Sequence, residues 1–204
     1  MSRTRAEDYS EKKTQIRTLS KALFAQQGYH VTSMSEVAHS CGISKGLLYH
    51  YYKSKDALLF DILESHLVEL TEAVEETASD LRAKKADTET ILLAIIRTLL
   101  SHYSDRDDDH RLQLAEMKSL SPDKQDILRA LEKRIIEPVN QVVTEEMIKH
   151  NENAVYAKPS TMSLFGILNW CFLWFRDDGA LNREEYAKMV AKLFLNGIRS
   201  LSAD

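Results

Sequence analysis

The sequence is poor in glycine and proline, with six and three of these residues among 204. A strand-rich fold needs many tight turns, so this shortage excludes a turn-rich β architecture and favours long helices. The polar start MSRTRAEDYSEKK lacks the apolar core of a signal peptide. The longest apolar stretch, LFGILNWCFLWF at 164–175, is too short to span a bilayer. We therefore expect a cytoplasmic protein.

Cysteine is also scarce, because the chain has only Cys41 and Cys171. Two distant cysteines give neither a disulfide framework nor a metal-ligand spacing. The segment HYSDRDDDH at 102–110 does collect two histidines and four aspartates. These acids lack an ordered i, i+4 ligand spacing, so we interpret the segment as an acidic loop between helices. We expect no metal and no cofactor.

The net charge of −4 hides an asymmetry along the chain. Residues 1–55 carry nine Lys or Arg and four Asp or Glu, a balance of +5, which leaves 18 and 27, or −9, for residues 56–204. A basic N-terminal part on an acidic remainder suggests that the N-terminal part contacts a polyanion. The same balance could also arise by chance, since lysine-rich termini are common.

Apolar residues recur with helical spacing along nearly the whole chain. Ile16, Leu19 and Leu23 mark a first helix, and Gly28 lies where a left-handed residue would end it. No segment has the alternation of a strand, so the predicted fold class is all-α. Beyond the first 60 residues, helices are expected near 88–104, 109–119, 123–150, 160–176 and 183–201. Pro138 predicts a kink or a break in the third of these.

Residues 33–52 have the features of two short helices joined by a tight turn. Ser33 and Glu36 fit a capping box, and Gly42 supplies the positive φ of the turn. Ser44 then caps a second short helix, in which Leu48 and Tyr52 would face inward. Two short helices with a glycine turn form a helix-turn-helix.

The outward residues of this second helix suit a DNA groove. Lys45 can reach a guanine edge or a phosphate, Gly46 allows close approach of the backbone, and Leu47 can touch a thymine methyl group. Tyr49, His50 and Tyr51 can donate hydrogen bonds to phosphates or bases, and Ser44 can bind a phosphate. Lys55 offers a further cation to the DNA backbone.

The stretch GYHVTSMSEVAHSCGISKGLLYHYYKSKDALL resembles the N-terminal domain of TetR-family transcriptional regulators, over about residues 10–60. The resemblance implies that the third helix enters the major groove and that a two-fold dimer binds a palindromic operator. It assigns DNA-facing positions to Ser33, Ser44, Lys45, Gly46, Tyr49, His50, Tyr51 and Lys55. The closing aromatic residue, often Phe in the family, is Tyr52 here, which keeps its core role.

The acidic remainder suggests a dimer interface. The segment 160–176 is apolar on nearly every face, and such a helix must be buried on every face. The last helix carries one apolar stripe. We expect these two helices to pair with their copies as a four-helix interface, as TetR-like regulators do. The predicted interface residues are Phe165, Leu168, Phe172, Tyr186, Val190, Leu193, Phe194 and Gly197.

The segment NWCFLWFRDDGALNREE at 169–185 is similar to the matching segment of acyl-CoA-responsive members of the family. The effector implied is an acyl-CoA, whose chain needs an apolar tunnel and whose phosphates need Arg or Lys at its mouth. The predicted effector-binding residues are Leu99, Tyr103, Met117, Phe165, Trp170, Trp174 and Arg176. Arg97, Arg111 and Lys118 are further candidates for the phosphates.

Together these features predict a helix-turn-helix DNA-binding domain at 1–55 and a helical ligand-binding and dimerisation domain at 56–204. The function favoured is a ligand-responsive repressor that a small-molecule effector releases from a palindromic operator. An enzyme is not expected, because no phosphate loop, H-E-x-x-H motif or nucleophile elbow occurs. The alternative is a non-enzymatic interaction module that keeps the fold but binds no operator. The sequence leaves the operator, the effector and the direction of its effect open.

Overall fold

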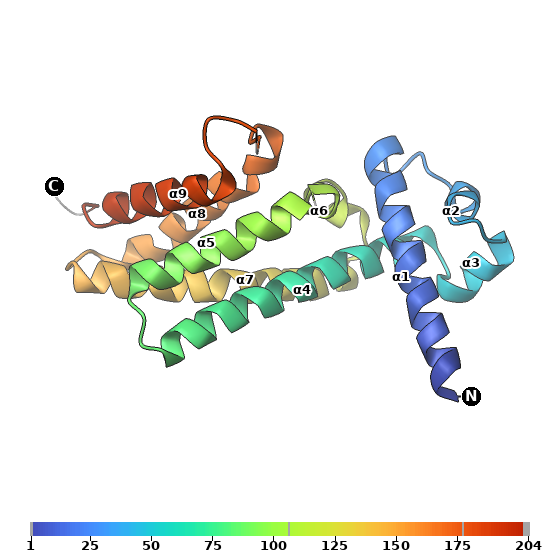
Figure 1. Ribbon diagram of the computed structural model, residues 1–204, viewed down its shortest axis with the longest axis horizontal. Helices are drawn as coiled ribbons and strands as arrows, with labels where there is room; N and C mark the ends of the chain where they lie inside the picture. Colours follow the sequence, from blue (N-terminus) through green and yellow to red (C-terminus); the bar gives the residue numbers. More distant parts are fainter. Residues whose placement is uncertain (1, 106, 177, 202–204) are drawn as a thin grey trace. The chain divides into compact units, whose positions relative to one another are not determined.

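The computed structural model describes residues 2–105, 107–176 and 178–201. Over these ranges the chain is all-α and contains no strand, as the sequence predicts (Figure 1). The chain divides into two compact units. Unit 1 comprises Met1–Leu67 and Asp107–Arg129, and unit 2 comprises Val68–Arg106 and Ala130–Asp204. None of the helices among the described residues combines the length and the apolar content needed to cross a bilayer.

Unit 1 is built from three N-terminal helices, α1 (Ser2–Gln27), α2 (Met34–Ser40) and α3 (Lys45–Tyr51). It also contains the start of α4 (Lys55–Ala83), α6 (Asp107–Glu116), the 3₁₀ turn η1 (Met117–Ser119) and the start of α7 (Pro122–Lys149). Helix α1 packs on both α2 and α6, and α2 packs on α3. The domain boundary predicted from the sequence, after residue 55, places α6 and the first turns of α4 in the second domain, whereas by their contacts they belong to unit 1. Whether the boundary at residue 55 separates DNA binding from ligand binding stays a prediction.

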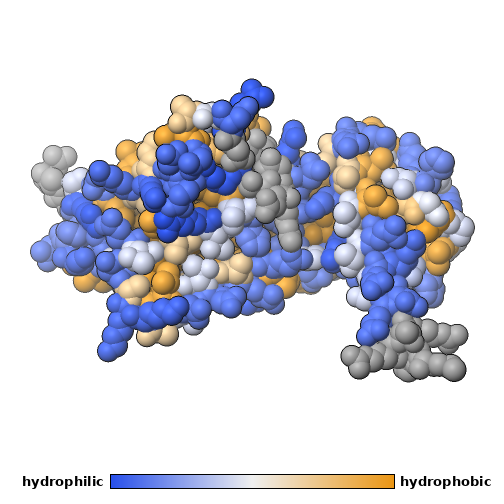
Figure 2. Space-filling view, in the orientation of Figure 1, coloured by the Kyte–Doolittle hydropathy of each residue, from blue (hydrophilic) through white to orange (hydrophobic). Residues whose placement is uncertain are grey.

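Unit 2 is a helical bundle formed by the remainders of α4 and α7 with α5 (Thr88–Asp105), α8 (Ala157–Asn169) and α9 (Arg183–Ile198). The short 3₁₀ turns η2 (Ala154–Tyr156) and η3 (Cys171–Leu173) flank α8. Helix α5 packs chiefly on α9 and also on α8. Apolar side chains interrupt the polar surface of unit 2 around α9 and the loop before it (Figure 2).

Two expectations about the helices were wrong, and of the kink or break expected at Pro138 the break is absent. The predicted helix 160–176 ends at Asn169 and continues as η3. Pro138 lies inside α7 without a break, because the buried face of α7 provides packing that outweighs one lost backbone hydrogen bond. The segment 102–110 is mostly helical rather than a loop, with its described residues at the end of α5 and the start of α6. Its acidic residues favour a helix start, since carboxylates stabilise the first turn.

Within the described ranges, His, Cys, Asp and Glu residues nowhere gather in a group of three or more that could hold a metal ion. Asp109 forms an ion pair with Lys21, in which Oδ2 lies 2.8 Å from Nζ, and this pair joins α6 to α1 inside unit 1.

A buried carboxylate joins three helices of unit 2. The side chain of Glu146 is completely inaccessible to solvent. Its Oε1 accepts a hydrogen bond from Arg199 Nε at 2.6 Å and lies 2.5 Å from Arg199 Nη2, with which it forms an ion pair. Thr88 donates to Oε2, and His150 Nε2 lies 3.1 Å from Oε1. Burial alone raises the pKa of Glu146, but the bonds from Thr88 and Arg199 outweigh it and hold the pKa below its ordinary value. The ion pair therefore ties the end of α9 to α7 and to the start of α5.

Candidate nucleic-acid interface

The helix-turn-helix is set by local caps, as predicted. The Ser33 hydroxyl accepts from the Glu36 amide at 3.2 Å, and the Glu36 carboxylate accepts from the Ser33 amide at 2.7 Å. These bonds hold the pKa of Glu36 below its ordinary value. Gly42 has a φ of +63°, and Ser44 caps α3 by accepting from the Leu47 amide at 3.1 Å. The start of each of these two helices is therefore determined by residues only a few positions away in the sequence.

Two inward residues hold α3 on unit 1. Leu48 and Tyr52 are buried, as predicted from their spacing. The Tyr52 hydroxyl donates to Asp61 Oδ2 at 2.7 Å, and Lys13 Nζ donates to Asp61 Oδ1 at 2.6 Å. Burial and the bond to Asp61 raise the pKa of Tyr52, so its phenol stays protonated. This network fixes the end of α3 to both α4 and α1.

The opposite side of α3 is exposed. We call the exposed side chains there, together with the cap residue, the reading face; they are Ser44, Lys45, Gly46, Leu47, Tyr49 and His50. Tyr51 is half-buried at the edge of this face. A small unit that leaves a leucine and a tyrosine exposed beside a lysine offers both apolar and cationic contacts to a partner. The structure therefore brings seven of the nine predicted DNA-facing residues together on one helix and its cap. Ser33, at the start of α2, is exposed, but its hydroxyl already caps that helix.

Gly46 has no role in the fold that requires glycine. Its φ lies outside the left-handed region, and an added Cβ would meet only the Ser44 hydroxyl oxygen, at 4.0 Å. Glycine inside a helix lowers stability relative to alanine. The fold therefore does not account for glycine at this position of the reading face, and its predicted role in close approach to DNA stays a prediction.

Replacing Gly46 with alanine is expected to separate stability from binding. The free energy of unfolding should rise by about 0.5–1 kcal/mol, because alanine loses less backbone entropy. Affinity for operator DNA should fall roughly 10-fold, because the methyl group would occupy the space of a base edge. Urea unfolding and fluorescence anisotropy measure the two quantities. Unchanged affinity in the stabilised variant would show that DNA does not approach Gly46.

Lys55, predicted to contact a phosphate, is held by backbone carbonyls of unit 1, and a contact to DNA stays a prediction. Its ammonium donates to the carbonyl oxygens of Tyr29 at 2.7 Å, His30 at 3.1 Å and Thr32 at 2.9 Å. It also lies 4.5 Å from the centre of the Tyr29 ring. A lysine ammonium has three N–H donors, so these three carbonyls account for all of them. The geometry fits a residue that holds the turn between α1 and α2, and the sequence could not reveal this because the carbonyls lie more than 20 residues away.

Replacing Lys55 with methionine should destabilise the protein without removing a phosphate contact. We expect a loss of about 1.5–3 kcal/mol of unfolding free energy, the usual range for hydrogen bonds from a charged group. The slope of log affinity against log salt concentration should stay unchanged. The matched Lys45→Met variant should lower that slope by about 0.9 for each lost phosphate contact. An equal change of slope in both variants would restore Lys55 as a DNA contact.

Two contacts of the interface were missed from the sequence. Asp61 is the acceptor that fixes Tyr52, and Tyr9 in α1 stacks on Tyr51 with ring centres 4.7 Å apart. Tyr9 and Tyr51 are 42 positions apart, so no local spacing could have indicated the pair.

The predicted effector residues are spread over different environments. Leu99, Tyr103 and Phe165 are buried in unit 2, where the Tyr103 hydroxyl donates to Asn169 Oδ1 at 2.9 Å. Met117 belongs to η1 of unit 1. Trp170, Trp174 and Arg176 are exposed, with Trp170 64% accessible. Because the helix expected over 160–176 ends at Asn169, these last three are not buried walls of one helix, and their role in binding an effector stays a prediction.

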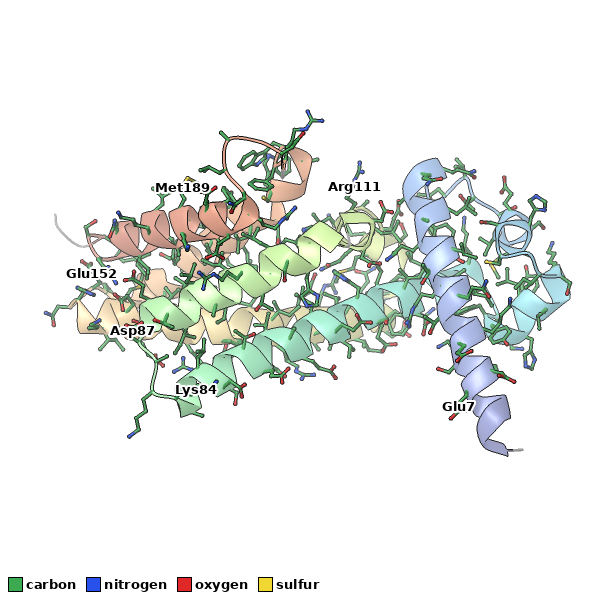
Figure 3. All side chains as sticks on the ribbon, viewed as in Figure 1. Glu7, Lys84, Asp87, Arg111, Glu152 and Met189 are labelled. Carbon is green, nitrogen blue, oxygen red and sulfur yellow. The ribbon has the colours of Figure 1, made fainter. Side chains whose placement is uncertain are left out.

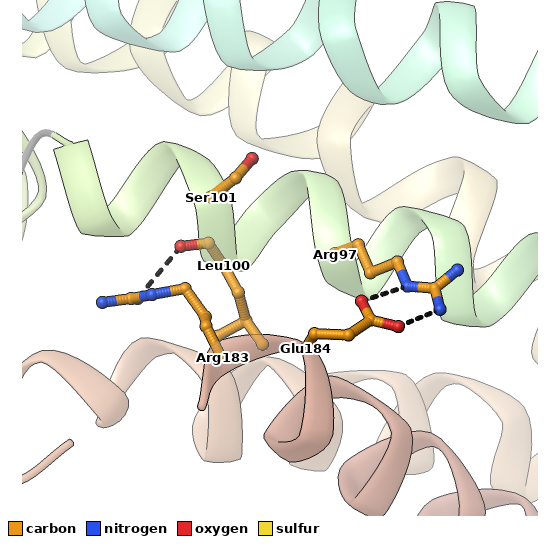
Figure 4. A pocket seen from close by; sticks show the side chains of 5 residues that line it. All are labelled: Arg97, Leu100, Ser101, Arg183 and Glu184. Carbon is orange, nitrogen blue, oxygen red and sulfur yellow. Dashed lines mark hydrogen bonds and ion pairs between the residues drawn. The ribbon is translucent and has the colours of Figure 1, made fainter. Parts of the chain in front are cut away.

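A cavity of about 200 Å³ lies between α5 and α9 (Figure 4) and is lined by Arg97, Leu100, Ser101, Arg183 and Glu184. None of the seven predicted effector residues lines it. Arg97 is paired with Glu184 through two nitrogens, and Arg183 donates to the Leu100 carbonyl at 3.1 Å. Arg97 was a candidate for effector phosphates, but here its charge is matched by a carboxylate. Arg111, another candidate, points away from α6 (Figure 3).

The predicted dimer residues divide into two groups. Five of them are buried within the single chain: Phe165, Leu168, Tyr186, Val190 and Phe194. Leu193, which is 64% accessible, and Gly197 are exposed on α9. The side chain of Phe172 lies outside the described residues. These five residues form part of the core of unit 2 in the single chain, while a second stripe faces outward; their role in a dimer interface stays a prediction.

The outward stripes lie on α8 and α9. On α8 the exposed residues Met162, Gly166 and Ile167 recur at helical spacing and are followed by the exposed C-cap Trp170. On α9 the exposed residues Met189, Leu193 and Gly197 recur in the same way. Met189 points away from the bundle (Figure 3). An added Cβ at Gly166 or Gly197 would meet no atom within 4 Å. We call these seven residues the α8–α9 face.

Comparison with known families gives two matches that follow each other along the chain. Residues 16–62 match the family model described as bacterial regulatory proteins of the tetR family, and residues 69–198 match the one described as the tetracyclin repressor-like C-terminal domain.

Individual proteins are similar over different lengths. The uncharacterized HTH-type transcriptional regulator YerO of Bacillus subtilis (strain 168) is 33% identical over 118 residues, which is 58% of this chain and 39% of that protein. The chain thus covers less than half the length of this relative. The structure of a TetR-family transcriptional regulator from Bordetella parapertussis 12822 superposes with a TM-score of 0.78 and 29% identity, covering 90% of this chain and 94% of that one. AibR, solved in complex with isovaleryl coenzyme A and operator DNA, gives a TM-score of 0.78 at 25% identity over 90% of this chain and 98% of its own.

Proposed function

The chain belongs to the TetR family of bacterial regulatory proteins, and we propose that it is a ligand-responsive repressor that binds a palindromic operator as a homodimer. Members of this family are DNA-binding transcription regulators rather than enzymes, so this chain is a regulator as well. The proposal places this repressor in the cytoplasm and makes its release from the operator depend on a small-molecule effector.

The observation that carries the proposal is the construction of α3. Leu48 and Tyr52 anchor one side of the helix, while the reading face on the other side stays exposed. A short helix anchored by two buried residues can enter a major groove without unfolding, and its lysine and aromatic hydroxyl can then contact base edges and phosphates. Gly46, which the fold does not need, supports the close approach of DNA at this helix.

The α8–α9 face supports a homodimer. The two glycines and five larger apolar residues of this face leave an apolar surface exposed to water. Exposed apolar patches of this kind mark protein–protein interaction sites. Small residues on facing helices allow close packing, and a C2 interface uses the same surface on both protomers. Two protomers joined in this way would present two copies of α3, as a palindromic operator requires.

An acyl-CoA remains the proposed effector. The solved AibR complex contains isovaleryl coenzyme A, and the sequence 169–185 is similar to the segment of acyl-CoA-responsive regulators. Helices α4 and α7 each contribute residues to both units, which gives ligand binding in unit 2 a continuous path to unit 1. If the effector changes the separation of the two α3 helices, operator affinity falls, and by linkage operator DNA weakens effector binding by the same factor.

Fluorescence anisotropy on the DNA that flanks the protein's own gene tests the proposal. The titration is made in moderate salt, against random DNA as the reference, and repeated with a panel of acyl-CoAs, the free acids and CoA alone. Sedimentation of the free protein gives its oligomeric state in the same buffer. Selective binding by a dimer, released by one acyl-CoA, would support every part of the proposal.

Other outcomes would overturn one part of the proposal and leave the rest standing. Selective binding that no acyl-CoA alters would keep the regulator and overturn the acyl-CoA effector. A monomer that binds selectively would overturn the dimer. Binding no tighter than to random DNA, if repeated on sites selected from random sequence, would favour the interaction module without operator binding.

A further inference from the structure

Three aromatic rings form a cluster at the edge of the reading face. Tyr9 in α1 stacks on Tyr51 with ring centres 4.7 Å apart and planes 23° apart. His50 meets both rings edge-on, at 6.3 Å from Tyr9 and 5.7 Å from Tyr51. Each ring therefore contacts the other two, and two of the three belong to the set predicted to face DNA.

Tyr9 is not a core residue. Its side chain is 42% exposed, and it lies in the N-terminal half of α1, about two turns before the buried Ile16. The match to the family's N-terminal domain begins at residue 16, so Tyr9 precedes the matched region. A tyrosine at this place that covers Tyr51 needs an explanation other than packing of the unit's interior.

We propose that Tyr9 is a positioning residue for DNA recognition, which holds the rings of Tyr51 and His50 in one orientation before DNA is bound. Tyr51 and His50 lie at the end of α3, where a frayed last turn would leave their side chains free to rotate. Stacking restricts those rotations in the free protein, so less conformational entropy is lost when the operator binds. The inference rests on the proposed binding of DNA by α3 and adds a residue from a different helix.

Offset stacking is the geometry that aromatic pairs prefer, and it depends on the ring rather than on the hydroxyl. A Tyr9→Phe variant should therefore keep the operator affinity of the natural protein. A Tyr9→Ala variant should bind the operator roughly 10-fold more weakly, the effect expected for loss of one aromatic pair. Ser10→Ala is the control, because Ser10 is an exposed residue on the same turn of α1, and its replacement should leave affinity unchanged.

A double-mutant cycle distinguishes positioning from direct contact. If Tyr9 acts through Tyr51, then Tyr9→Ala introduced into a Tyr51→Ala protein should cost less than about 3-fold in affinity. The slope of affinity against salt should be the same in the natural protein and in Tyr9→Ala, because no phosphate contact is lost. Thermal unfolding of each variant shows that the proteins remain folded.

Operator binding by the natural protein is the reference for every variant. If the natural protein shows no selective DNA binding, the proposed function fails. If it binds selectively and Tyr9→Ala binds equally well, the positioning role is overturned. Loss of affinity in Tyr9→Phe, or a full 10-fold loss from Tyr9→Ala in the Tyr51→Ala background, would also overturn it, since either would show that Tyr9 contacts DNA itself.

Discussion

A variant with Lys45 and Tyr49 both replaced by alanine is expected to bind operator DNA at least about 100-fold more weakly than the natural protein while remaining folded. Each good base or phosphate contact contributes about 1–3 kcal/mol, and in a dimer every substitution removes its contact twice. Both side chains are exposed, so their removal costs the fold little. Anisotropy titrations measure the affinity, and urea unfolding measures the stability.

The chain offers a matched control for this variant. Tyr156 and Lys158 form another exposed tyrosine and lysine pair, in unit 2, and Tyr156 is 43% accessible against 38% for Tyr49. Replacing both with alanine changes the composition and the net charge by the same amount. Operator affinity of this control should fall less than about 3-fold, as expected for side chains outside the reading face. An equal loss in the two variants would mean that overall charge, rather than α3, sets the affinity.

The second large effect concerns stability. Replacing Glu146 with alanine should lower the free energy of unfolding by about 3 kcal/mol or more, because it removes the buried partner of Arg199 and of Thr88. Glu145 is the control. It is the adjacent residue, its side chain is 46% exposed, and it pairs with Arg82 at 2.8 Å. Because exposed ion pairs contribute little, Glu145→Ala should cost less than about 1 kcal/mol.

The same pair predicts a dependence on pH. The pKa of Glu146 is lower in the folded protein than its ordinary value. Its contribution to stability is therefore complete above the unfolded pKa of about 4.3 and is lost as the pH falls through the lower, folded pKa. Other carboxylates with lowered pKa, such as Glu75 and Glu184, add to the same trend. Glu146→Ala should remove part of the decrease below about pH 5, and an unchanged slope of stability against pH would contradict the assignment.

Local signals in the sequence predicted the helix-turn-helix well. The capping box at Ser33, the turn at Gly42 and the cap at Ser44 each depend on residues within a few positions, so they can be read directly. Burial of Leu48 and Tyr52 followed from their spacing. The family resemblance over the same stretch agrees with the match at residues 16–62.

Contacts between distant residues could not be predicted in this way. Lys55 looked like a free cation because nothing near it in sequence indicates the three carbonyls it binds. Helix α9 has apolar residues on two faces, and only the packing on α5 shows that Tyr186 and Val190 face the core while Leu193 faces outward. Pro138 predicted a kink or a break, and the helix continues through it without a break.

Selection of DNA sites from random sequence tests the central claim most directly, namely that α3 reads DNA. The natural protein and the Lys45→Ala/Tyr49→Ala variant are put through the same rounds of selection, and the enriched sequences are compared. We expect the natural protein to enrich a two-fold symmetric site and the variant to enrich none. Enrichment of the same site by both proteins, or of no site by the natural protein, would contradict the account.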